Sequence, residues 1–223
     1  MLLSIIRGSG VSWYNVIAAV LSSLAVIFLT LPIHEFSHAF VATKLGDPTP
    51  KFQGRLTLNP FAHIDYIGAL CIILFGFGWA KPVQINARYF KSPKWGMALS
   101  SLAGPLSNIV VAFISLIIYN AARFLPVSDI TFALLYFFYY LAQINVYLAV
   151  FNLIPIPPLD GSRILFSVLP QKYYFAVMRY ERYIYIALLA LLWLGVLTVP
   201  LNILSNLILG GLSNVAALPF NLI

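Results

Sequence analysis

Apolar residues along this chain gather into long runs that short polar breaks separate. Four of the runs predict membrane-spanning helices, because a helix needs about 20 mostly apolar residues to cross a bilayer. A fifth run is softer, since it contains three asparagines and a Gly-Gly pair. The pattern predicts an all-α polytopic membrane protein, a helical transmembrane bundle forming a single domain over residues 1–223. In chain order the predicted spans cover residues 13–44, 97–120, 131–155 and 183–199, and the softer run covers 201–218.

Two of the polar breaks alternate between apolar and polar positions with the two-residue period of a strand. These segments, 51–58 and 83–90, predict a small β-hairpin or sheet beside the membrane. Between them lies the apolar run 66–79, whose 14 residues reach about 21 Å as a helix against a hydrocarbon core of about 30 Å. Asp65 is suited to cap a helix that begins at Tyr66.

The composition agrees with a membrane protein, with 61% hydrophobic residues, 9% charged residues and a mean hydropathy of +0.93. A net charge of +7 is also compatible with nucleic-acid binding. However, the basic residues lie in short segments between apolar runs, where the positive-inside rule accounts for them, so we expect no nucleic-acid partner. The acidic residues number only six, and each one in or beside an apolar run is a candidate for function. They are Glu35, Asp47, Asp65, Asp129, Asp160 and Glu181.

The first apolar run contains the motif His34-Glu35-x-x-His38. Histidines four residues apart lie on one face of a helix, so both imidazoles can reach one zinc ion about 2 Å away. The neighbouring carboxylate of Glu35 can accept a proton from an attacking water and pass it to a leaving amine. A chance match is the alternative. It is disfavoured because ionisable groups inside a membrane helix are costly unless a metal compensates them.

Two histidines leave zinc under-coordinated, so the hypothesis requires a third protein ligand from another element. His63, Asp65 and Asp160 are the candidates. His63 and Asp65 have simpler interpretations, as a loop hydrogen-bonding residue and a helix cap. Asp160 follows the proline-dense turn 155–158, which breaks a helix near the membrane surface, and such irregular backbone is tolerated where it lines a cavity. Asp160 is therefore the favoured third ligand.

A second motif lies more than a hundred residues after the first and reads Asn152-Leu-Ile-Pro-Ile-Pro-Pro-Leu-Asp160-Gly161. Together, the two motifs resemble the site-2 protease family, the intramembrane zinc metalloproteases. The stretch Gly104-Pro-Leu-Ser-Asn108 is similar to the one on the middle core helix of that family.

The resemblance covers residues 16–170 and leaves the last two apolar runs as additions. The segments 55–60 and 81–83 resemble the small branch of the family, which has no PDZ or CBS module, and we expect none here. Three residues depart from that branch, which often has proline at their positions. They are Tyr66, Gln84 and Ala87.

This resemblance implies a three-helix catalytic core in which His34, His38 and Asp160 bind one Zn²⁺ and Glu35 is the catalytic base. Asn152 would then hold the substrate backbone, and an interhelical structural bond is the alternative for it.

Asn108 is a second candidate for contact with substrate, although a structural role for it is equally open. The implied activity is hydrolysis of peptide bonds in transmembrane protein or peptide substrates within or near the lipid bilayer, as in regulated intramembrane proteolysis. The implied location is a prokaryotic cell membrane. A homo-oligomer is left open.

Shared zinc ligation restricts the topology. If 66–79 crossed the membrane, His38 and Asp160 would lie on opposite faces and could not share an ion. We therefore predict that this segment is re-entrant. Segments 43–96 and 156–182 then lie on one face with 11 basic residues, against 2 on the other, and the positive-inside rule puts the active-site face in the cytoplasm.

The main competing function is a non-proteolytic zinc-binding membrane transporter or sensor. Such a protein would use the same ligands without needing Glu35 beside them. Replacing Glu35 with glutamine distinguishes the two, because only the protease depends on that carboxylate.

Overall fold

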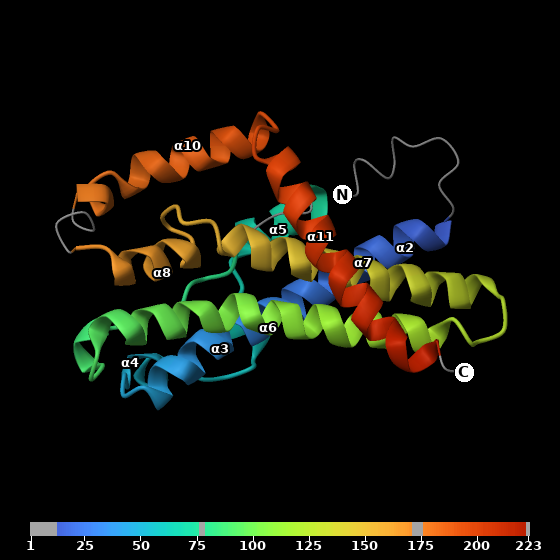
Figure 1. Cartoon of the computed structure of the whole chain (residues 1–223), viewed down its shortest axis with the longest axis horizontal. Coiled ribbons are helices and arrows are strands. Elements are labelled where there is room, and N and C mark those ends of the chain that lie inside the picture. The colour runs from blue at the N-terminus through green and yellow to red at the C-terminus, as the bar shows by residue number, and fades with distance from the viewer. Residues whose placement is uncertain (1–12, 76–78, 171–175, 222–223) are drawn as a thin grey trace.

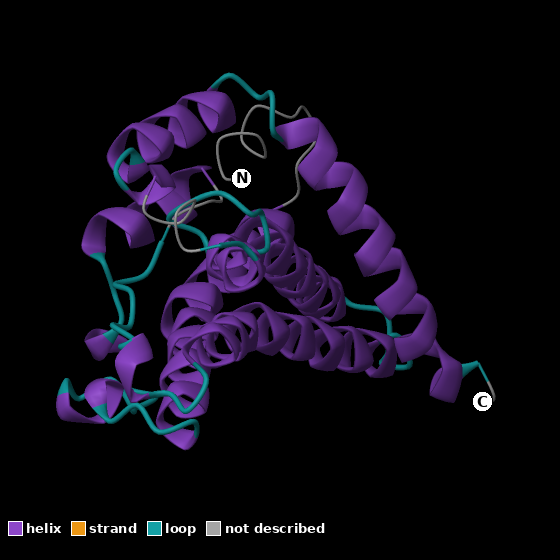
Figure 2. Cartoon of the chain, turned by 60° about the vertical axis from the view of Figure 1, so that its left-hand side comes forward, coloured by secondary structure: helices purple, strands orange, loops and turns teal. Residues whose placement is uncertain are grey.

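A computed structural model describes residues 13–75, 79–170 and 176–221 of the chain (Figure 1). Within these residues the fold consists of helices and loops, with no strand (Figure 2). Four helical stretches there are long and apolar enough to cross a membrane, which confirms the expected all-α polytopic membrane protein. They are Trp13–Lys44, Pro93–Ala122, Asp129–Asn152 and Thr198–Phe220.

The elements carry the labels of Figure 1. In chain order they are α2 (Trp13–Ala25), the π-helical turn η1 (Val26–Thr30), α3 (Leu31–Lys44), α4 (Thr49–Phe52), the 3₁₀ turn η2 (Pro60–Ala62), α5 (Tyr66–Phe75), the 3₁₀ turn η3 (Ala87–Tyr89), α6 (Pro93–Ala122), α7 (Asp129–Asn152), α8 (Asp160–Val168), α10 (Glu181–Trp193), α11 (Thr198–Ala217) and the 3₁₀ turn η4 (Leu218–Phe220).

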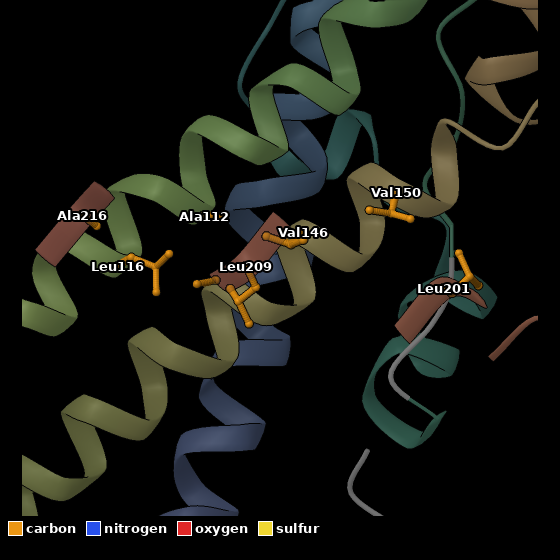
Figure 3. Close-up of a cluster of buried hydrophobic side chains, with 8 residues drawn as sticks. Ala112, Leu116, Val146, Val150, Leu201, Leu209 and Ala216 are labelled. Atoms are coloured by element: carbon orange, nitrogen blue, oxygen red, sulfur yellow. The ribbon is translucent and has the colours of Figure 1, made fainter. Parts of the chain in front are cut away.

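The centre of the molecule is a bundle in which α6 packs against α7 and α3, and α2 packs against α7. The long helix α11 runs obliquely across α6 and α7, and a buried apolar cluster joins the three, including Leu116, Val146 and Leu209 (Figure 3). Ala112 and Ala142 are fully buried in this cluster, and their small side chains let the helix backbones approach closely. The bundle thus supports every element that carries the candidate site.

The helix α10 lies apart from α6 and α7 (Figure 1). It has only 13 residues, about 20 Å of helix, and is not among the four long apolar helices. The run 183–199, expected as a span, is divided between α10 and the first residues of α11. Leu188 is the one buried side chain among those described on α10.

The first spanning helix contains a wide π-helical turn, η1, one turn before Pro32. The Leu31 N–H donates to the Val26 carbonyl, five residues back, instead of four. Proline lacks an N–H and its ring crowds the preceding turn, so a wider turn accommodates it. The Asn145 amide of α7 donates to the Thr30 hydroxyl at 3.2 Å and ties this turn to the bundle.

The predicted β-hairpin is wrong. In 51–58 the chain instead ends the short helix α4, because Thr49 and Pro50 suit a first helical turn. In 83–90 the backbone is extended at first but pairs with no strand in the part of the chain that the structure describes. Its amides bind side chains, since the Asn86 N–H donates to Asp47 Oδ2 at 2.7 Å. The alternating pattern thus indicated an extended segment but not its partner.

The short helix α5 begins at Tyr66, as expected, and Asp65 caps it by accepting hydrogen bonds from two amides of the first turn. The segment just before α5 and the segment that follows it lie next to each other. The Lys81 N–H donates to the His63 carbonyl at 2.8 Å. Residues 76–78 of the predicted re-entrant run lie outside the described residues.

Candidate metal centre and catalytic cavity

Three candidate ligand atoms converge in the structure. His34 Nε2 and His38 Nε2 are 3.0 Å apart, and Asp160 Oδ2 lies 3.4 Å and 3.2 Å from them. Zinc bound at about 2.0–2.2 Å by nitrogen and oxygen holds tetrahedral ligands about 3.3 Å apart. The donor set therefore fits zinc, and it is the one metal-competent cluster of three such groups among the described residues.

Local sequence brings these residues together. His34 and His38 are one turn apart on the face of α3 that packs against α6. Asp160 is the first residue of α8, which folds back after the proline-dense turn. Any Cβ on Gly161 would overlap the carbonyl of Leu153 at the end of α7, so glycine allows this close return.

The middle helix α6 fixes the orientation of both imidazoles. His34 Nδ1 lies 3.3 Å from Asn108 Oδ1, and His38 Nδ1 lies 2.7 Å from the Ser100 carbonyl. Both partners are oxygen acceptors, so each Nδ1 carries the proton and donates it. The two Nε2 atoms are then left unprotonated toward the metal, which is the usual arrangement of metal-binding histidines.

Gly104 of α6 faces the two histidine rings. A Cβ at this position would overlap His38 Nε2 and the His34 ring. The glycine therefore leaves the space in which the ligand atoms meet.

Asp160 reaches the ligand cluster with a mostly buried carboxylate. Burial raises the pKa of this carboxyl, but the neighbouring His38 and His34 outweigh burial and hold its pKa well below its usual range. This lowering holds while the two histidines are protonated, and a bound metal would supply the positive charge in their place.

Glu35 is buried beside the cluster, with 7% of its surface exposed. The Val83 N–H donates to Glu35 Oε2 at 2.9 Å, so the extended segment after α5 holds this carboxylate. Val83 offered no signal in the sequence because it acts through its backbone.

The ligands and Glu35 line a cavity of about 240 Å³. Asn152 also lines it, from the end of α7, and its Nδ2 donates to the Leu148 carbonyl at 3.0 Å. Apolar side chains of α7 and α10 complete the walls, among them Phe151 and Leu188. The cavity therefore offers a polar, metal-competent end and an apolar remainder.

The other sequence candidates lie elsewhere. Asn108 is buried behind His34 and does not line the cavity. His63 donates from Nε2 to the Thr57 carbonyl at 2.9 Å, and Asp65 caps α5. Neither belongs to the ligand cluster, so their simpler interpretations are confirmed and Asp160 remains as the third ligand candidate.

Sequence reasoning missed the Ser100 carbonyl, the steric role of Gly104 and the position of Arg163 on the cavity wall. The stretch that begins at Gly104 stands out in the sequence only through its similarity to the middle core helix of the family. A backbone carbonyl such as that of Ser100 leaves no residue-type signal at all.

Comparison with known proteins agrees with this geometry. The sequence model of Peptidase family M50 matches residues 125–195, which include Asn152 and Asp160. The protein "Putative zinc metalloprotease YwhC" of Bacillus subtilis is 41% identical over 168 residues, which cover 74% of this chain and 77% of that protein.

More distant relatives carry similar names. "Putative zinc metalloprotease Rip2" of Mycolicibacterium smegmatis is 32% identical over 143 residues, 60% of this chain and 51% of that protein. "Zinc metalloprotease MJ0392" of Methanocaldococcus jannaschii is 29% identical over 173 residues, 78% of this chain and 41% of that protein. No solved structure matches the chain.

Proposed function

This chain belongs to peptidase family M50, the site-2 protease family of intramembrane zinc metalloproteases, and we propose that His34, His38 and Asp160 hold its zinc while Glu35 moves the proton. The observation that carries the assignment is the convergence of the three ligand atoms beside a buried glutamate. As a member of this family, the protein acts on membrane protein substrates.

Zinc, when bound, supplies a Lewis acid that polarises the scissile carbonyl and lowers the pKa of water. Glu35 accepts the proton of the attacking water and delivers it to the leaving amide nitrogen. The Val83 amide donates to Glu35 Oε2, and both carboxylate oxygens keep a lone pair free for the proton. The backbone donor thus fixes the carboxylate without competing for the proton.

Asn152 binds the backbone of an extended substrate in this proposal. Its place on the cavity wall supports that role, and its Nδ2 bond to Leu148 leaves Oδ1 to accept from a substrate amide. Of the two roles considered for Asn108, the bond to His34 supports the structural one.

The proposed topology has α5 as a re-entrant segment, with the zinc site facing the cytoplasm and the N-terminus outside. The hydrogen bond between His63 and Lys81 supports re-entry, because it joins the chain before α5 to the chain after it. The approach of His38 to Asp160 supports it as well. The basic residues concentrate on that same face, which favours the cytoplasm.

Cysteine accessibility labelling tests this topology, because Cys71 is the sole native cysteine and can be replaced first. Single cysteines placed in 50–58 and 84–91 should react from the cytoplasmic side. Labelling of the two segments from opposite sides would contradict re-entry.

The zinc-loaded full chain and its Glu35→Gln variant test the activity. We expect equal zinc content, cleavage of a model transmembrane substrate by the wild type, and loss of about 100-fold or more in the variant. Asp129→Asn, at an exposed carboxylate at the start of α7, serves as the control and should cleave normally. Cleavage that survives in Glu35→Gln would overturn the role of Glu35, and a zinc protein that cleaves nothing would favour a transporter or sensor.

A further inference from the structure

A second cavity, of about 360 Å³, adjoins the catalytic one. Pro158 and Arg163 line both cavities, so the two meet at this pair. None of the proposed ligands, Glu35 or Asn152 lines the second cavity. Its walls come from the chain after Val83, the start of α6, α8 and the start of α10, including Gln84, Lys94, Phe166 and Glu181. It is therefore a distinct chamber that opens beside the zinc site.

Arg163 stands at the junction of the two cavities. It follows Asp160 by three residues on α8, so it lies about one helical turn from the zinc ligand and on the same side of the helix. Its side chain is half-buried, and no hydrogen bond or ion pair engages it in the described part of the chain. Desolvation of a partly buried guanidinium without a partner costs free energy. The planar guanidinium matches a carboxylate, with which it can form two parallel hydrogen bonds.

The chain itself supplies no such carboxylate. Its six acidic side chains all lie within the described residues, and their ion pairs with other described residues within 4.0 Å are those of Asp160 with the two histidines. Glu35 and Asp47 accept backbone hydrogen bonds elsewhere. Glu181 shares the second cavity with Arg163 but makes no ion pair with it. Lys94 adds a second cation to the wall, so the described residues of the lining carry an excess of positive charge over Glu181.

We infer that Arg163 binds an acidic side chain of the substrate, and that the second cavity is the subsite that accommodates it. This inference rests on the proposed function. A substrate strand lying over the zinc site advances about 3.3 Å per residue, and one helical turn is about 5.4 Å. An Asp or Glu within two or three residues of the scissile bond therefore reaches Arg163. The position of this residue on the walls of both the second cavity and the catalytic cavity favours a substrate carboxylate over a lipid phosphate.

The test uses the zinc-loaded full chain in detergent and a model transmembrane substrate that the wild type cleaves. Glu, Gln and Lys are placed in turn at each position within four residues of the cleaved bond, on both sides. At one position, we expect Glu to exceed Gln in kcat/KM by about tenfold or more, and Lys to fall below Gln. Binding of the same series to the Glu35→Gln variant should follow the same order.

Arg163→Glu should reverse the preference at that position, so that Lys becomes the best residue, while the zinc content stays that of the wild type. Arg163→Gln, which removes the charge and keeps a similar length, should abolish the preference and covers the case in which the reversed charge prevents folding. The matched control is Arg182→Glu, at an exposed arginine of α10 that lines neither cavity, which should keep the preference for Glu.

Equal cleavage of all substrates by the wild type would overturn the inference, as would an Arg163→Glu variant that still prefers Glu. A charge effect of Arg163 that appears only in vesicles containing anionic lipid, and not in phosphatidylcholine vesicles, would assign the residue to lipid headgroups instead. If the wild type cleaves none of the substrates, the proposed function itself fails, which is a separate outcome.

Discussion

Two walls of the catalytic cavity are fixed in different ways. The ligand wall, formed by α3 and α8, is held from behind by directional contacts with α6, in which His34 and His38 donate to Asn108 and to the Ser100 carbonyl. The α10 wall contributes mostly apolar side chains, and Leu188 is the one buried side chain among those described on this helix. Directional contacts tolerate little displacement, whereas apolar contacts are non-directional. Changes to the ligand wall should therefore affect zinc, and changes to the α10 wall should affect substrate.

The largest effect is expected from Gly104→Ala. The new Cβ would overlap His38 Nε2, so the imidazoles must move away from the position that zinc requires. Zinc content measured by elemental analysis should fall to background, and cleavage should fall by about 100-fold or more.

Gly210→Ala is the matched control for that change, because a Cβ there meets nothing within 4 Å. It should keep zinc and activity. Full zinc content in Gly104→Ala would show that the ligand wall is more adaptable than its contacts imply.

A smaller effect is expected from Asn108→Ala, which removes the acceptor for His34 Nδ1–H. Loss of such a partner costs about 10–100-fold in metal affinity. Competition with a zinc chelator measures that affinity directly. Asn120→Ala, on the same helix, removes a bond to the Leu116 carbonyl and serves as the control. If both variants hold zinc equally well, Asn108 does not position His34.

The smallest effect is expected from Leu189→Ala on the α10 wall. Loss of a few apolar groups from a substrate contact should lower kcat/KM by about two- to tenfold. The zinc content should not change, which separates this wall from the other. Leu191→Ala, at a residue of α10 that does not line the cavity, should leave both quantities unaltered. A loss of zinc in Leu189→Ala would contradict the distinction between the walls.

The convergence of His34, His38 and Asp160 could be predicted from the sequence better than the contacts around them. His34 and His38 share a helix face by spacing alone, and the proline-dense turn pointed to Asp160. The residues that orient them could not be found in the same way, because the partner of His38 is the carbonyl of Ser100, and any residue has one.

The error over strands has a related cause. Alternation in 83–90 is compatible with any extended segment, but a sheet also needs a neighbouring strand. Here side-chain carboxylates of Glu35 and Asp47 take the place of that neighbour. Long-range pairing of a backbone with side chains leaves no periodic signal in either segment.

The π-helical turn at Val26–Thr30 amounts to one additional residue within an otherwise regular helix. Loss of a single residue inside that turn would restore ordinary helical winding and leave the flanking faces in place. Loss of one residue between Leu31 and His34 would instead rotate the histidines by about 100° relative to everything before them. The helix can therefore accommodate the loss of one residue before Leu31, within the π-helical turn, but not between Leu31 and His34.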